Sequence, residues 1–148
     1  MKKAVLLGFA GALSIGVAFA MAHAGAKGIV KERMDLMSMV AGQTKTLAMM
    51  TRGRADINWE VVAKAGDKIA AAGQTFPTLF PEDSFKSPSE ALKTILTDSE
   101  GFAAESQAMT DAGLALTASA ETQDEEALKA AFGQLRGTCK SCHSGYRE

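Results

Sequence analysis

The sequence predicts an all-α fold, an antiparallel four-helix bundle. Apolar residues recur with helical spacing along most of the chain beyond residue 26, and no series of strand-like alternation is present. The three prolines all fall between residues 76 and 88, where the helical spacing breaks. The links before and after that segment are short, which makes consecutive helices antiparallel neighbours.

The first two helices are predicted from their apolar spacing and their end signals. The first is expected over about 27–52, with Gly53 as its stop. The second is expected over about 57–74, with Asp56 as its N-cap. The segment 76–87 that follows is predicted to be the one long connection.

The other two helices begin at capping patterns. Ser87, Pro88 and Glu90 place a capping hydroxyl, a proline at the first helical position and an acid at the third. A third helix is therefore expected to begin there and to end near Ser119. A second capping pattern at Thr122 predicts a fourth helix that continues into residues 139–143.

The first 24 residues are predicted to be a cleaved signal peptide. Lys2 and Lys3 precede an apolar run over 4–20, and the small residues at 22 and 24 form a signal-peptidase pattern. The functional domain is then 25–148. A retained anchor and cleavage after Ala20 remain alternatives.

Cleavage would leave a weakly acidic chain. Loss of Lys2 and Lys3 reduces the 16 basic residues to 14, against 17 acidic residues, so the formal charge becomes −3. This balance argues against a nucleic-acid partner.

The chemically informative stretch is Cys-x-x-Cys-His near the end of the sequence, with Cys139, Cys142 and His143. On a helix these side chains project from one side, about one turn apart. Two thiols can then attach to the vinyl groups of one porphyrin edge while the imidazole reaches the iron. The motif predicts one covalent haem c, with Cys139 and Cys142 binding the cofactor and His143 the iron.

Other uses of the two cysteines remain open at this point. A zinc site needs four ligands, but the chain has two cysteines and two histidines, one of them His23 in the predicted signal peptide. A redox dithiol would be expected beside a βαβ pattern. A disulfide between Cys139 and Cys142 would close too short a loop to stabilise much.

The sequence resembles the cytochrome c′ superfamily, the class II cytochromes c, and within it the low-spin methionine-ligated members. The resemblance is carried by residues 33–37, 52–53, 128–133 and 139–147, and by a loop at 76–81 similar to one in the methionine-ligated members. It implies a four-helix bundle with a haem near the C-terminus. It also implies a periplasmic location, because bacteria attach c-type haem outside the cytoplasm.

The family resemblance directs attention to Arg33 and Met37, one helical turn apart on the first helix. Met37 occupies the position where high-spin members have an apolar residue that blocks the sixth site of the iron. Met37 is predicted to ligate the iron, with Met34 in reserve, and Arg33 to bind a haem propionate. The alternative is that Met37 is one of several core methionines and only packs beside the haem.

The predicted function is single-electron transport through a haem ligated by His143 and Met37. The alternative is a five-coordinate, high-spin module that binds or sequesters nitric oxide or other small gases. No enzymatic activity is predicted, because no distal histidine or other acid–base pair is evident. Redox proteins are the expected partners. A monomer is favoured over a homodimer, because charged residues cover the outward faces of the first two helices.

Overall fold

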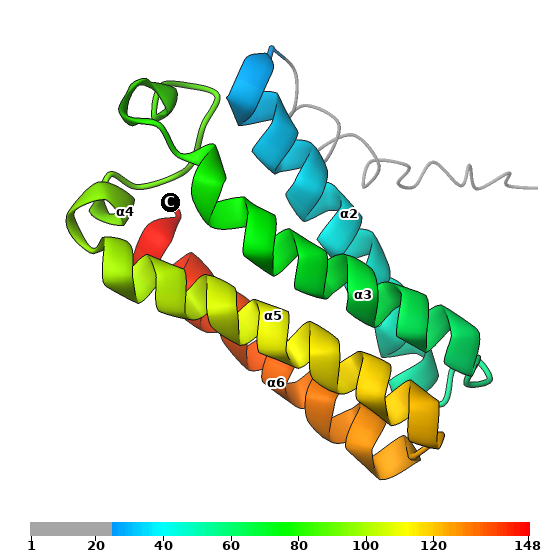
Figure 1. The fold of residues 1–148 in the computed structure, drawn as a ribbon. Coiled ribbons are helices and arrows are strands. Elements are labelled where there is room, and N and C mark those ends of the chain that lie inside the picture. Colours follow the sequence, from blue (N-terminus) through cyan, green and yellow to red (C-terminus); the bar gives the residue numbers. More distant parts are fainter. Residues whose placement is uncertain (1–24) are drawn as a thin grey trace, which may run out of the picture.

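The structure, a computed structural model, describes residues 25–148, so the predicted signal peptide lies outside the described residues. Its main helices are α2 (Gly28–Thr51), α3 (Trp59–Thr75), α5 (Ser99–Thr122) and α6 (Glu125–Tyr146), which form a four-helix bundle (Figure 1). The predicted fold is confirmed. Between residues 25 and 148, no helix combines the length and apolar character that crossing a membrane requires.

Three shorter elements lie in the long connection between α3 and α5. They are η1 (Phe76–Leu79), η2 (Glu82–Ser84) and α4 (Thr94–Thr97). Figure 1 shows this connection at the same end of the bundle as the start of α2 and the C-terminus. The two tight links, between α2 and α3 and between α5 and α6, lie at the other end.

Glycines bring α3 and α5 into close contact. A Cβ atom on Gly113 would lie 2.5 Å from the backbone nitrogen of Ala70 and 2.7 Å from the carbonyl oxygen of Gly66. A Cβ on Gly66 would in turn lie 2.8 Å from the backbone nitrogen of Thr117. The two backbones therefore approach to a separation that only glycine permits at these positions.

The apolar residues form two clusters. The larger one fills the bundle between the four main helices, and its largest fully buried members are Leu47, Val62, Ile69, Leu116, Leu128 and Leu135. The smaller one lies at the end with the long connection and contains Leu79, Phe80, Ile95 and Phe102, with Cys142 and Tyr146 packed against it. The haem motif thus begins where one cluster meets the other, because Cys139 packs against the larger cluster.

Two predicted N-caps are replaced by nearby residues. The N-cap of α3 is Asn58 rather than Asp56, and its side chain accepts a hydrogen bond from the amide of Val61 at 3.1 Å. The N-cap of α6 is Asp124 rather than Thr122, and it accepts from the amide of Ala127 at 3.0 Å. Each observed N-cap lies two residues after the predicted one and is an equally good acceptor. The presence of both helices was therefore predicted correctly, but their first residues were not.

The predicted start of the third helix at Ser87 is wrong. Residues 85–93 are not helical, and α5 begins only after Asp98, whose carboxylate accepts from the amide of Gly101 at 3.2 Å. The backbone groups of the intervening segment bind the C-terminus instead: the amide of Leu92 donates to the carbonyl of Tyr146 at 3.0 Å. A long-range pairing has therefore replaced the local helix that the capping pattern predicted.

Candidate haem-binding site

The last turns of α6 carry the predicted haem motif along one wall of a cavity of about 530 Å³. Cys139, Cys142 and His143 all line this cavity, and both cysteines are free thiols. Ligand sites in proteins typically enclose roughly 300–1,000 Å³. The structure brings together all three residues that the motif predicted, on one helix face and beside a single apolar space.

Burial changes the acid–base behaviour of the two thiols. It raises the pKa of Cys139, and it raises the pKa of Cys142 to about 11, with smaller contributions from the charges of Glu105 and Cys139. Both groups are therefore protonated at neutral pH. A buried neutral thiol is a poor nucleophile, which is unfavourable for a redox dithiol.

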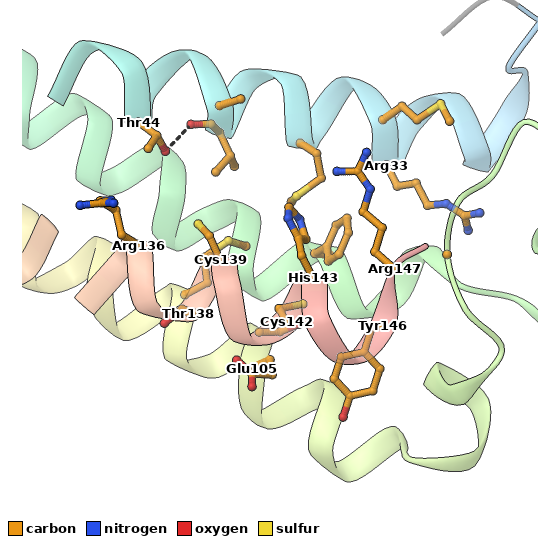
Figure 2. Close-up of a pocket in the computed structure, with 18 of the residues that line it drawn as sticks. Arg33, Thr44, Glu105, Arg136, Thr138, Cys139, Cys142, His143, Tyr146 and Arg147 are labelled. Atoms are coloured by element: carbon orange, nitrogen blue, oxygen red, sulfur yellow. Dashed lines mark hydrogen bonds between the residues drawn. The ribbon is translucent and has the colours of Figure 1, made fainter. Parts of the chain in front are cut away.

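The imidazole of His143 lines the cavity, as does Arg147. Figure 2 shows both side chains extending from α6 toward α2. Burial lowers the pKa of His143, and the positive charge of Arg147 lowers it further. The imidazole is consequently kept neutral, the form that can donate a lone pair to a metal.

The donor set fits a covalently attached haem. One imidazole and two thiols line the same cavity, which is otherwise largely apolar. Among residues 25–148, no group of three or more histidine, cysteine, aspartate or glutamate side chains is arranged to hold a metal ion directly. The zinc alternative therefore has no ligand set within this part of the chain.

The α2 wall of the cavity is formed mainly by small and flexible apolar side chains. Met34, Met37, Val40 and Ala41 all line it. Met37 is half-buried and packs against the larger apolar cluster. Met37 therefore lies on a different wall of the cavity from the haem motif. Its contacts with the larger apolar cluster are enough to explain why it is partly buried.

Arg33 is buried in the loop beside the cavity, with 4% of its surface exposed. Its guanidinium donates to the carbonyl of Leu79 at 3.2 Å and to the hydroxyl of Ser84 at 2.9 Å. It also donates to the carbonyl of Ser84 and to the hydroxyl of Ser89. Burial lowers its pKa. Arg33 lines the cavity, as a propionate-binding residue would, and its donors are engaged by the loop; propionate binding stays a prediction.

Sequence reasoning missed two acidic residues at the cavity. Glu105 on α5 accepts a hydrogen bond from the hydroxyl of Ser141, inside the Cys-x-x-Cys motif. Glu90 pairs with Arg147. Neither contact has a sequence signal, because each joins residues at least 36 positions apart.

Comparison with known proteins identifies relatives over almost the whole of this domain. The sequence matches the family described as Cytochrome C′ over residues 28–147. It is 32% identical over 139 residues to cytochrome c′ of Rhodopseudomonas palustris, covering 93% of this chain and 92% of that protein. It is 30% identical over 120 residues to cytochrome c′ of Pararhodospirillum photometricum, covering 80% of this chain and 95% of that protein.

Solved structures agree with the sequence matches. Cytochrome c′ from Rhodopseudomonas palustris superposes with a TM-score of 0.75 at 31% identity, covering 83% of this chain and 98% of that one. Cytochrome c′ from Rubrivivax gelatinosus superposes with a TM-score of 0.74 at 26% identity, covering 81% of this chain and 94% of that one.

These relatives correct the function predicted from the sequence. They are cytochromes c′, so the likeness to low-spin, methionine-ligated members is not supported, and the prediction of an electron carrier with a haem ligated by His143 and Met37 is wrong. Met37 was predicted to ligate the iron because of its position on the first helix. A methionine that only packs beside the haem would occupy the same position, so the position does not distinguish the two roles. The findings favour the alternative, a five-coordinate gas-binding module. The chain belongs to the cytochrome c′ family, whose members carry a covalently attached c-type haem.

Proposed function

We propose that the protein binds nitric oxide or another small gas at a haem iron for which His143 is the only protein ligand. The observation that carries this proposal is the contrast between the two walls of the cavity. His143, the single histidine among residues 25–148, lies on α6. The α2 wall, apart from Arg33, Thr44 and Lys45, presents apolar side chains that include two thioethers. When bound, the haem would supply an iron that can take a small gas as a ligand.

The chain's own residues divide the remaining work. Cys139 and Cys142 hold the cofactor covalently, and His143 binds the iron from the α6 side. Met37 and Met34 keep the opposite side apolar and exclude water, which favours small uncharged ligands over polar ones. One relative of this fold, cytochrome c prime from Alcaligenes xylosoxidans, has been solved as a nitric oxide complex of a mutant, so the fold is compatible with that ligand.

Absorption spectra of the ferric and ferrous holoprotein test the proposal directly. We expect a high-spin ferrous spectrum and uptake of carbon monoxide and nitric oxide without prior loss of a protein ligand. Met37→Ala should keep the high-spin spectrum and accelerate carbon monoxide binding, because it removes bulk from the α2 wall. Met49→Ala on the same helix is the control, because Met49 is exposed and does not line the cavity. A low-spin wild-type spectrum that becomes high-spin only in Met37→Ala would refute the proposal.

The cellular setting proposed for this function is the periplasm, where the predicted signal peptide would direct the chain. A gas that binds ferrous iron requires a reduced haem, so redox proteins that supply electrons are the proposed partners. We propose a monomer without enzymatic turnover. Sedimentation of the holoprotein at micromolar concentration tests its oligomeric state, and a mass twice that of one haem-bearing chain would contradict it.

A further inference from the structure

The end of α6 is held by a segment that lies some 50 residues earlier in the sequence. Ala91 and Arg147 form an isolated antiparallel bridge. On one side of it the amide of Leu92 donates to the carbonyl of Tyr146 at 3.0 Å, and on the other the amide of Glu148 donates to the carbonyl of Glu90 at 2.9 Å. We call residues 90–98 together with 145–148 the C-terminal clasp.

The clasp satisfies helix-end groups that would otherwise have no partner. The last carbonyls of a helix lack intrahelical donors, and many helices end with a glycine that turns the chain back to cover them. Here Arg147 is extended instead, with φ −135° and ψ 145°. The hydroxyl of Thr94 donates to the carbonyl of Gly145 at 3.2 Å. The final turn of α6, which contains His143, is therefore completed by residues of the clasp.

Two side-chain contacts reinforce this backbone pairing. The Nε atom of Arg147 donates to Oε2 of Glu90 at 2.8 Å, and a second guanidinium nitrogen binds the same oxygen. The hydroxyl of Tyr146 donates to the carboxylate of Asp98 at 2.6 Å. The residue directly after the last helical position is thus fixed by both its backbone and its side chain.

The Glu90–Arg147 pair contributes little to global stability. The two side chains are 46% and 50% exposed, and an exposed ion pair is worth about 0–1 kcal/mol. Its effect is on position. Arg147 is one helical turn beyond His143, both line the cavity, and both extend toward α2 in Figure 2. The carboxylate of Glu90 binds the guanidinium of Arg147 and so constrains its position beside His143.

We propose that Glu90 is a positioning residue, which holds Arg147 beside His143 and keeps the last turn of α6 in one orientation. The part that concerns the iron rests on the function proposed above. The part that concerns the clasp rests on the contacts of the chain alone. Loss of Glu90 frees Arg147 and loosens the turn that carries His143.

The experiment compares three variants of the holoprotein with the wild type. Glu90→Ala removes the acceptor, and Glu90→Gln keeps an acceptor without the charge. Glu60→Ala is the control, since Glu60 forms an exposed ion pair with Lys64 on α3, and neither residue lines the cavity. Hydrogen exchange of the peptide 143–148 reports on the clasp, and the iron–histidine stretching band of the ferrous protein reports on His143.

In Glu90→Ala we expect exchange of 143–148 to accelerate roughly two- to five-fold, as loss of an exposed ion pair implies. The iron–histidine band should shift, Glu90→Gln should fall between Glu90→Ala and the wild type, and Glu60→Ala should match the wild type. Unchanged exchange in Glu90→Ala, or faster exchange without a band shift, would overturn the proposal. If the wild-type iron proves six-coordinate, the proposed function fails. The hydrogen-exchange comparison still tests the clasp in that case. The reduction potential then replaces the iron–histidine band as the readout of a change at His143.

Discussion

The guanidinium carbon of Arg33 lies 4.7 Å from the centroid of the Phe80 ring and 5.8 Å from that of Phe85. Arg33 therefore combines two cation–π contacts with its four hydrogen bonds to the loop, at 4% exposure. Phe80 also lines the cavity. One side chain of α2 thus fixes the loop that forms part of the cavity wall.

Arg33→Met should destabilise the holoprotein by on the order of 3 kcal/mol, because several charge-assisted hydrogen bonds are lost and the loop carbonyls stay buried. Arg33→Lys should recover only part of this, since an ammonium group cannot reproduce the planar fork. Thermal unfolding measures the loss, and limited proteolysis within residues 79–89 localises it. Unchanged proteolysis together with a shifted reduction potential would assign Arg33 to a propionate instead.

Gly113→Ala should destabilise the bundle by about 1–3 kcal/mol, because the new Cβ would collide with backbone atoms of α3. A backbone atom cannot be displaced without moving the helix to which it belongs. Gly42→Ala on α2 is the control. A Cβ there meets nothing within 4 Å, and alanine in a helix should stabilise by about 0.5–1 kcal/mol. Chemical denaturation of both variants checks the prediction. Equal stabilities would mean that α3 and α5 are not in such close contact.

Tyr146 should give the protein a stability that declines at alkaline pH. Its hydrogen bond to Asp98 raises its pKa to about 12, with burial and nearby negative charges adding to the shift. A raised pKa in the folded state means that folding favours the protonated phenol. The contribution is complete below the unfolded value of about 10 and is lost as the pH rises toward 12.

The measurement is the pH dependence of unfolding between pH 9 and about 12, in wild type and Tyr146→Phe. The wild type should lose stability more steeply over this window. Because Tyr146 is the only tyrosine, its phenolate titration can also be followed directly by difference absorption. A phenol that titrates near its ordinary value would contradict the Asp98 contact.

Cys139→Ala combined with Cys142→Ala should give little folded protein. A cofactor that binds only the folded state stabilises that state, and its loss leaves an apolar cavity of about 530 Å³ open. Yield, haem content and a melting curve of the purified double variant check this. Recovery of a cooperatively melting apoprotein would show that the bundle folds without haem.

Much of the fold could be predicted because it depends on local signals. The apolar spacing and the three prolines located the main helices and the long connection, and the Cys-x-x-Cys-His spacing located the cofactor site. The start of α5 could not be predicted, since the pattern at Ser87 is a good helix start and only the distant pairing of Ala91 with Arg147 overrides it. The role of Arg33 was equally hidden, because its partners are scattered over residues 79–89.

The distal side of the iron shows a different limit. Met37 lies where the sequence placed it, on the cavity wall of α2. A methionine at that position can act either as an iron ligand or as a packing residue. The residue type alone therefore does not distinguish an electron carrier from a gas-binding protein. The choice came from the relatives, and it went against the first prediction.

The position of the haem motif in the last helix has a consequence for how the protein is made. During synthesis, α2, α3 and α5 emerge before Cys139, Cys142 and His143 do. Three of the four main helices are therefore synthesised before any residue that could attach the cofactor. Premature termination anywhere upstream would yield a chain with no means of acquiring haem, so every molecule that carries the cofactor has been synthesised through all four main helices.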